Sequence, residues 1–215
     1  MSTEPTKAPT HYSPIEEWGH SLSHGAGFIA SIVALVVMLQ ASGDDPWRIA
    51  SSLVFGISMC LLYASSTIYH AVPPGPWKLW LRKVDHSAIF LLIAGTYTPF
   101  TLISLRDDGG WWLFGIVWAI ALAGVILKIF TGAKFQKLSI ALYLMMGWLV
   151  VTMGETMLRL VPHEGLWWLL AGGLCYSGGV VFYVQKKLFF HHVIWHLFVL
   201  AGSICHFLAI YWYVL

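Results

Sequence analysis

Seven continuous apolar runs restrict the fold of this chain more than any other feature of its sequence. Each is close to the roughly 20 residues that a helix needs to cross the hydrocarbon of a bilayer. Only 10% of the residues are charged, against about 25% in a typical soluble domain. An outer-membrane barrel is excluded because its strands alternate apolar and polar residues. The sequence therefore predicts an all-α integral membrane protein, a bundle of seven transmembrane helices.

The runs are separated by short stretches rich in glycine, proline and aspartate, which are typical of turns. The expected spans are residues 19–41, 48–71, 84–104, 111–130, 138–160, 165–185 and 190–214. Residues 1–15 form a polar tail without the apolar segment of a cleaved signal peptide, and residues 16–215 form one membrane domain. Small residues in the fourth and sixth spans predict close helix packing; they are Gly115, Ala119, Gly124, Gly172, Gly173, Gly178 and Gly179.

Lysine and arginine are distributed unevenly between the two sides of the membrane. Nine lie in the N-terminal tail and the second, fourth and sixth loops, and three lie in the other loops. Because positive loops remain in the cytoplasm, the N-terminus is expected inside and the C-terminus outside. The net charge of +2 and the absence of a basic surface exclude nucleic acid as a partner.

Seven of the ten histidines are expected at the cytoplasmic ends of their spans. These are His20, His24, His70, His86, His191, His192 and His196. Ionisable side chains within a bilayer are costly and mark functional sites by default. The orientation was derived from lysine and arginine alone, so this gathering of histidines at one depth is an independent signal for a site.

His192 and His196 share one helix face, because residues four apart lie one turn from each other. Such a pair can chelate one metal ion, and a third imidazole would give the open three-ligand geometry of catalytic zinc. His70 is the preferred third ligand, since Ser66 lies one turn away and could support it. His20 and His24 have the same spacing and remain rivals.

Asp85 stands where the third span enters the bilayer, and two readings of it remain open. It could pair with Lys83 or Arg82 at the interface, or it could lie near the metal and accept a proton from its water. His86 and His191 are expected at the interface. His206 is ten residues beyond His196, about 15 Å along a helix, which is too deep for the same site.

The sequence resembles the haemolysin III branch of the progestin and adipoQ receptor family. The resemblance covers about residues 16–200 and rests on motifs in the expected order. They are Glu16-Glu17 with His24-Gly25, Ser66-x-x-x-His70, Asp85-His86-Ser87, Ala94-Gly95-Thr96-Tyr97-Thr98-Pro99 and His192-x-x-x-His196. One departure is His20, at a position where bacterial relatives usually carry a polar amide.

The resemblance implies a seven-helix protein of the bacterial cytoplasmic membrane with zinc near its inner face. It implies that His70, His192 and His196 hold the zinc, that Asp85 contacts the water on it, and that Ser66 lies close by. Glu17, His20 and His24 would be neighbours of these ligands.

Two functions follow from these expectations. The first is a zinc-dependent hydrolase of lipid amides or esters, in which Asp85 and Ser66 are catalytic and a membrane lipid is the substrate. The alternative is a membrane sensor or regulator of lipid or energy homeostasis, without turnover, in which zinc is structural. A fourth protein ligand would favour the second function. Ion transport is disfavoured because the ionisable groups gather at one face.

Overall fold

A computed structural model describes residues 12–215, so residues 1–11 of the expected tail lie outside the described part. Helices account for nearly all of this part and it contains no strand. In chain order the elements are α1 (Pro14–Ser42), α2 (Pro46–Ala71), α3 (Pro76–Pro99), η1 (Phe100–Ser104), η2 (Arg106–Gly110), α4 (Trp111–Thr131), α5 (Gln136–Trp148), η3 (Leu149–Met153), α6 (Gly154–Leu160), α7 (His163–Val184) and α8 (His191–Tyr213).

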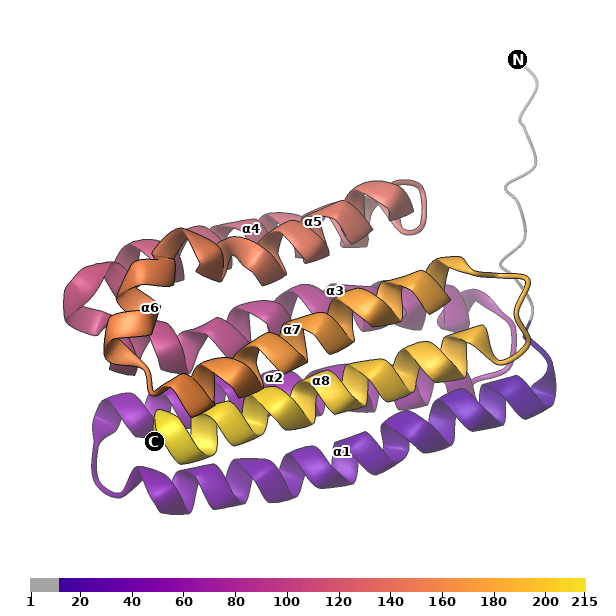
Figure 1. The fold of residues 1–215 in the computed structure, drawn as a ribbon. Helices are drawn as coiled ribbons and strands as arrows, with labels where there is room; N and C mark the ends of the chain where they lie inside the picture. The colour runs from indigo at the N-terminus through magenta and orange to yellow at the C-terminus, as the bar shows by residue number, and fades with distance from the viewer. Residues whose placement is uncertain (1–11) are drawn as a thin grey trace.

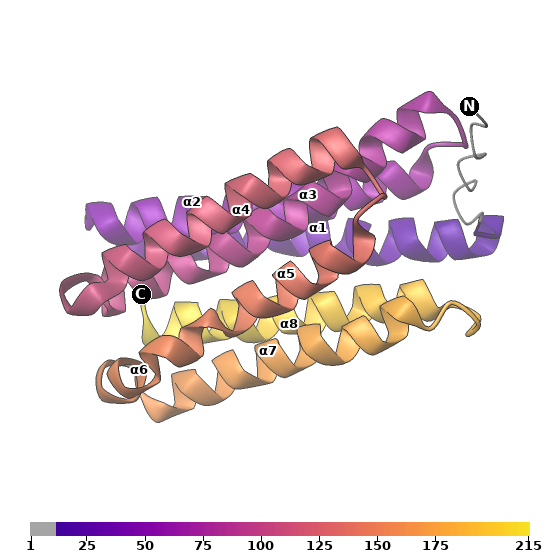
Figure 2. The ribbon, with the colours of Figure 1, turned by 90° about the horizontal axis from the view of Figure 1, so that it is seen from above.

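These elements form seven helical rods, each long and apolar enough to cross a membrane. Successive rods run in opposite directions, and the start of α1 and the C-terminus lie at opposite ends of the bundle (Figure 1). Helices α1 to α4 pack side by side, α8 packs against both α1 and α7, and α5 crosses obliquely between the two groups (Figure 2). The expected all-α membrane fold is confirmed.

Polar caps fix where the first two helices begin. The Ser13 hydroxyl accepts a hydrogen bond from the Glu16 backbone N–H at 3.4 Å, and the Glu16 carboxylate accepts one from the Ser13 N–H at 3.0 Å. The Asp45 carboxylate accepts bonds from two backbone N–H groups at the start of α2. Each cap satisfies N–H groups that have no partner within the helix, an effect worth about 1 kcal/mol.

The third helix begins earlier than the sequence predicts. It starts at Pro76 rather than residue 84, so Lys78, Arg82 and Lys83 lie on a helix and not in a loop. Proline suits the first helical position because its missing N–H would have no partner there. The apolar run marks only the part of a helix that is in hydrocarbon, and α3 continues beyond it.

The fifth rod is interrupted, which the sequence does not predict. Between α5 and α6 the chain forms a 3₁₀ segment, Leu149–Met153. The hydroxyl of Tyr97, on α3, donates to the Met146 carbonyl at 2.7 Å and accepts from the Val150 N–H at 2.8 Å. A side chain from another helix thus replaces part of the backbone ladder, which is a known cause of breaks in helices.

Glycine allows close packing at some of the expected positions but not at all of them. A Cβ on Gly124 would collide with the ring of Phe90, whereas a Cβ on Gly115 would meet nothing within 4 Å. Phe90 is fully buried, so its ring is surrounded by other atoms of the protein. Gly172 and Gly179 also lie against neighbouring side chains, whereas a Cβ on Gly173 or Gly178 would find ordinary contact distances.

We expect Gly124→Ala to destabilise the protein by about 1–3 kcal/mol, the usual cost of overpacking a core. Gly115→Ala is the matched control on the same helix. It should be neutral or stabilising by up to about 1 kcal/mol, because alanine favours helix over glycine. Thermal unfolding of both variants in detergent tests this, and equal midpoints would contradict the packing described for α3 and α4.

Candidate metal centre

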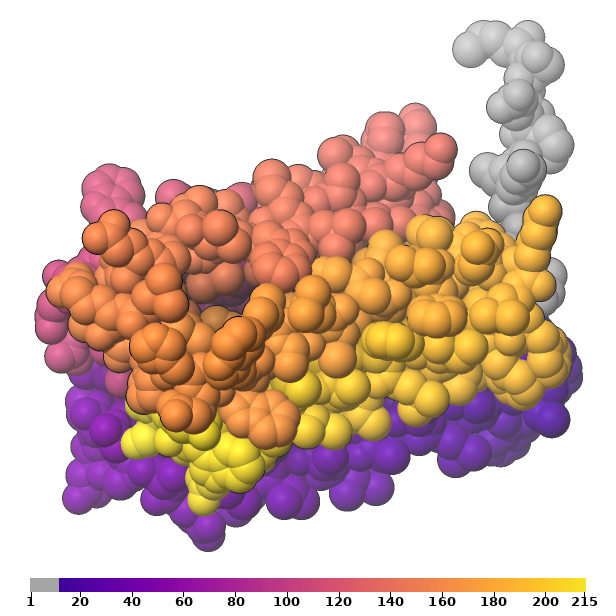
Figure 3. Space-filling view, viewed as in Figure 1, coloured from indigo at the N-terminus to yellow at the C-terminus, as the bar shows by residue number. Residues whose placement is uncertain are grey.

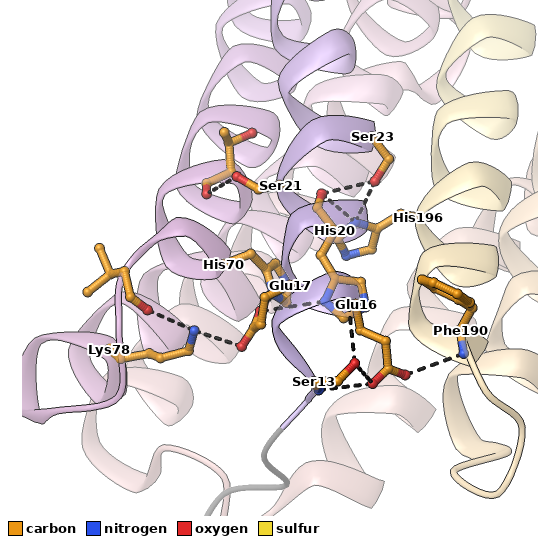
Figure 4. A network of polar contacts seen from close by, with 12 residues as sticks. Ser13, Glu16, Glu17, His20, Ser21, Ser23, His70, Lys78, Phe190 and His196 are labelled. Atoms are coloured by element: carbon orange, nitrogen blue, oxygen red, sulfur yellow. Dashed lines mark hydrogen bonds and ion pairs between the residues drawn. The ribbon is translucent and has the colours of Figure 1, made fainter.

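Histidines from three helices meet at the end of the bundle where the described chain begins. We call this the histidine end. Helix α1 contributes His20 and His24, α2 contributes His70, and α8 contributes His191, His192 and His196. Figure 4 shows His20, His70 and His196 converging between these helices, with Glu17 beside them. The structure therefore brings together residues that are up to 176 positions apart in the sequence.

Three of these side chains form a group with the geometry of a metal site. One ring nitrogen from each of His70, His192 and His196 lies within 4.8 Å of the other two. The separations of their ring centroids are 5.3, 5.2 and 4.7 Å. All three residues are buried. We refer to them as the histidine triad.

The hydrogen bonds of His70 leave one ring nitrogen available for a metal. Its Nδ1 lies 2.6 Å from Glu17 Oε2. An ionised carboxylate can only accept, so Nδ1 carries the hydrogen and Nε2 keeps its lone pair. That Nε2 is buried, and no residue in the range 12–215 gives it a hydrogen bond. A carboxylate that holds a ligating imidazole in this way is the usual partner of a metal-bound histidine.

His196 is held in an equivalent manner by α1. Its Nδ1 lies 3.2 Å from the His20 backbone carbonyl and 3.1 Å from Ser23 Oγ. A carbonyl only accepts, so Nδ1 donates and Nε2 retains its lone pair. The third member, His192, has a buried Nδ1 without a hydrogen-bond partner in the described part of the chain. The triad thus offers unshared lone pairs, as a metal requires.

Glu17 also contacts two other side chains. Its Oε1 lies 2.8 Å from Lys78 Nζ, and its Oε2 lies 3.5 Å from His20 Nδ1. Lys78 in turn donates to the Val72 carbonyl at 2.9 Å. The lysine therefore fixes the carboxylate, and the carboxylate fixes the ring of His70.

We expect Glu17→Gln to weaken metal binding about 10–100-fold, the usual cost of losing such an outer partner. The amide keeps the size of the side chain but removes the charge that orients and polarises His70. Competition with a chromophoric chelator measures the affinity. Glu16→Gln is the matched control, because Glu16 bonds Ser13 and the Phe190 N–H instead of a triad ring. Equal affinities of the two variants would contradict this role of Glu17.

His20 and His24, the alternative candidates for a metal ligand, lie differently relative to the triad. His20 is fully buried, and its ring centroid lies 4.5 to 5.3 Å from those of the triad. With Glu17 and His70 it forms a second group of potential metal ligands. His24 stacks face to face on His196 with centroids 3.5 Å apart. Parallel stacked rings cannot direct in-plane lone pairs at one ion, so this arrangement of His24 does not suit a shared metal.

Asp85 is paired with His86, not with Lys83 or Arg82 as the first reading of it expected. Its Oδ2 lies 3.1 Å from His86 Nδ1, while Lys83 donates to the Ile129 carbonyl. The Nε2 of His86 lies 3.3 Å from the Tyr183 hydroxyl. His86 was expected at the interface, and its contact with Asp85 was not predicted from the sequence. The adjacency of Asp85 and His86 was the available signal, and the side-chain directions that join them are not visible in a sequence.

An apolar cavity of about 480 Å³ reaches the triad from inside the bundle. His192, His196, His24, Ser66 and Asp85 line the end of this cavity nearest the triad. Ser66 is buried here, but His70 donates its hydrogen bond to Glu17 and not to Ser66. Mainly aliphatic and aromatic side chains line the remainder, most of them from α3, α5, η3, α6, α7 and α8.

The far end of this cavity reaches the outer surface of the bundle. Val151, Leu158 and Trp167 line the cavity and are also more than half exposed. The space-filling view shows a hollow in this part of the surface, bordered by the orange segment that contains α6 and α7 (Figure 3). A second, wider pocket of about 700 Å³ lies on the other side of His70 and is lined by Glu17, Lys78 and Arg82. The triad therefore lies between the apolar cavity, which His192 and His196 line, and a second pocket, which His70 lines together with charged side chains.

Comparison with known proteins identifies the family. A model described as haemolysin-III related matches residues 12–207. The chain is 44% identical over 200 residues to a hemolysin-3 homolog of Bacillus subtilis, which covers 92% of this chain and 94% of that protein. It is 42% identical to hemolysin-3 of Bacillus cereus, over 93% of this chain and 92% of the relative.

A human protein, the monocyte to macrophage differentiation factor, is 32% identical over 95% of this chain and 86% of its own length. The seven spans and the family agree on a multi-pass integral membrane protein, and the Bacillus relatives fit the cytoplasmic membrane of a bacterium. The chain belongs to the haemolysin-III related family.

Proposed function

We propose that this protein is a zinc-dependent hydrolase of lipid amides or esters. The observation that carries the proposal is that the histidine triad, a carboxylate and a hydroxyl adjoin one end of an apolar cavity whose other end reaches the surface of the bundle. An acyl chain fits such a cavity, because ligand sites of this kind combine apolar walls with a few convergent polar groups.

The triad would hold the metal through His70, His192 and His196, leaving a coordination position free for chemistry. Imidazole ligands suit zinc, copper, iron and nickel, and three protein ligands with an open position are typical of catalytic zinc. When bound, such an ion polarises a carbonyl and brings the pKa of water to about 7.

Asp85 would move the proton of the reaction. Water attacks the carbonyl carbon of the substrate, and an Asp85 carboxylate oxygen accepts the proton that the water loses. The bond to the leaving nitrogen or oxygen then breaks, and Asp85 returns the proton to the leaving atom, giving a fatty acid and an amine or alcohol. Oδ2 of this carboxylate lies 3.1 Å from His86 Nδ1, and the side chain of Asp85 lines the cavity.

Ser66 would stabilise the negative charge that develops on the carbonyl oxygen. Its side chain is buried and lines the same cavity as Asp85. A hydroxyl that donates to a developing oxyanion in a site without bulk water is worth far more than the same bond in water.

We further infer that the histidine end faces the cytoplasm, as the lysine and arginine distribution indicates. Alkaline phosphatase fused after Leu215 should then be active, because that enzyme folds only outside the cytoplasm. A fusion that is present in the membrane but inactive would show that the C-terminus lies in the cytoplasm and that the histidine end faces the other side.

One observation favours a second function, a sensor or regulator with structural zinc. His20 is buried among the triad rings, and both of its ring nitrogens lack hydrogen bonds in the described part of the chain. As a fourth ligand it would close the coordination sphere, which is the arrangement of structural zinc.

The test of the hydrolase uses purified protein in phosphatidylcholine nanodiscs, with zinc restored to one ion per chain. Ceramides and long-chain acyl esters serve as substrates, and mass spectrometry measures the fatty acid released. We expect release by the wild type, loss after chelation and recovery when zinc is returned. A zinc-loaded protein that releases no fatty acid from any of these lipids would overturn the proposal.

A further inference from the structure

A second polar cluster lies deep in the bundle, away from the triad. It consists of Tyr63 on α2, Tyr176 on α7, and Ser203 and His206 on α8. Tyr63 donates to Ser203 Oγ at 2.7 Å, and the Tyr176 hydroxyl also lies 2.7 Å from Ser203 Oγ. The ring of His206 lies 5.4 Å from that of Tyr176. Such groups are costly inside a membrane and mark functional sites by default.

The imidazole of the cluster has an unused acceptor. His206 Nε2 lies 3.1 Å from the Leu169 carbonyl. The carbonyl only accepts, so Nε2 donates and Nδ1 keeps its lone pair. Nδ1 is buried, and residues 12–215 supply it with no hydrogen-bond donor. An unsatisfied buried polar atom of this kind calls for an explanation.

The hydroxyls of the cluster have an unused donor. Tyr63 directs its hydrogen to Ser203 at 2.7 Å and to the Val199 carbonyl at 3.4 Å, and a single further bond joins Ser203 to Tyr176. Each hydroxyl has one hydrogen. One of the two hydrogens on Ser203 and Tyr176 therefore has no acceptor among the contacts of the described residues. The cluster offers one free acceptor and one free donor, which is the complement of a hydroxyl group.

Two glycines fix the rings of the cluster in place. A Cβ on Gly172 would collide with the ring of His206, and a Cβ on Gly202 would lie 2.8 Å from Cε2 of Tyr176. Both rings therefore rest directly on the backbone of a neighbouring helix. The cluster is held by packing as well as by hydrogen bonds, as a preorganised binding site requires.

His206 and Tyr176 line the same cavity as the triad residues His192 and His196. Because His206 follows His196 by ten residues on α8, the two lie about 15 Å apart along the helix axis. The cavity wall between them is mainly apolar, with side chains such as Leu92 and Val199. An extended apolar chain could reach both ends.

We propose that this cluster is a subsite for a hydroxyl group on the chain of a lipid that occupies the cavity. The ligand class is a long-chain acyl lipid with a hydroxyl near the middle of the chain. The hydroxyl would donate to His206 Nδ1 and accept from Ser203 or Tyr176. The inference rests on the proposed function only in placing an acyl chain in the cavity, and binding requires no turnover.

Equilibrium binding to protein in phosphatidylcholine nanodiscs tests the subsite. The probes are a fatty acid with a mid-chain hydroxyl and the unsubstituted acid of the same length. We expect the wild type to prefer the hydroxy acid about fivefold to tenfold, the net worth of one hydrogen bond. His206→Phe should abolish the preference. His206→Asn, which places an amide oxygen near the position of Nδ1, should retain part of it.

Each outcome decides the proposal. If the wild type binds the two acids with equal affinity, the proposed subsite is wrong, whereas the proposal that the cavity binds an acyl chain still stands. This result is expected if a water molecule alone satisfies the cluster. A preference that survives in His206→Phe also overturns it. Binding of neither acid overturns both the subsite and the lipid cavity. Asp85→Asn should keep the preference for the hydroxy acid, so a failure of hydrolysis is distinguishable from a failure of the subsite. If His206→Phe does not fold, the comparison of the two acids on the wild type still tests the subsite.

Discussion

Replacing His192 with alanine should remove the metal from the purified protein. The triad then retains two imidazoles, on different helices, and loses the chelate formed within α8. The fall in affinity should exceed the roughly 10–100-fold that loss of an outer partner costs. Elemental analysis after dialysis against a weak chelator measures the metal content, which should drop from one ion per chain to a small fraction.

His191→Ala is the matched control for this variant. His191 is the preceding residue and is also buried, but its Nδ1 contacts the Phe182 carbonyl at 3.2 Å and it belongs to neither group of potential ligands. This variant should keep its metal. If His192→Ala retains one metal ion per chain, or if both variants lose the metal equally, the triad is not the metal site.

Replacing Asp85 with asparagine should reduce hydrolysis by about 10²–10⁴-fold, the usual contribution of a positioned general base. Asparagine has the same shape but cannot accept the proton from the attacking water. Because Asp85 belongs to neither group of potential ligands, the metal content should remain that of the wild type. Initial rates of fatty acid release, measured together with bound metal, test both statements.

Asp44→Asn, in the exposed turn before α2, provides the control and should hydrolyse lipid at the wild-type rate. Loss of metal from Asp85→Asn would show that Asp85 supports the metal instead of the proton transfer. Unchanged hydrolysis in a metal-loaded Asp85→Asn protein would exclude Asp85 as the base.

The seven rods were predictable because length and apolarity alone decide whether a segment crosses a membrane. The start of α3 at Pro76 was not predicted, since a helix continues past the hydrocarbon wherever its caps allow. The break between α5 and α6 was also missed. It depends on Tyr97, whose hydroxyl reaches residues 49 and 53 positions away, and a local sequence pattern carries no trace of such a contact.

The sequence indicated the group His70, His192 and His196. His192 and His196 are four residues apart on one helix, and His70 is expected at the same depth in the membrane. The structure brings these three residues together. The partner of His70 could not be foreseen in the same way. Ser66 was expected from its spacing on α2, whereas Glu17 reaches the ring from α1. Contacts within one helix follow from periodicity, but contacts between helices depend on how each helix is rotated.

The measurement that tests the central claim most directly is X-ray absorption at the zinc edge on the purified, zinc-loaded protein. We predict three imidazole nitrogens and one exchangeable oxygen from solvent, with the same spectrum for His20→Asn. Four imidazoles without a solvent oxygen, reduced to three in His20→Asn, would contradict the hydrolase and establish a closed site that includes His20.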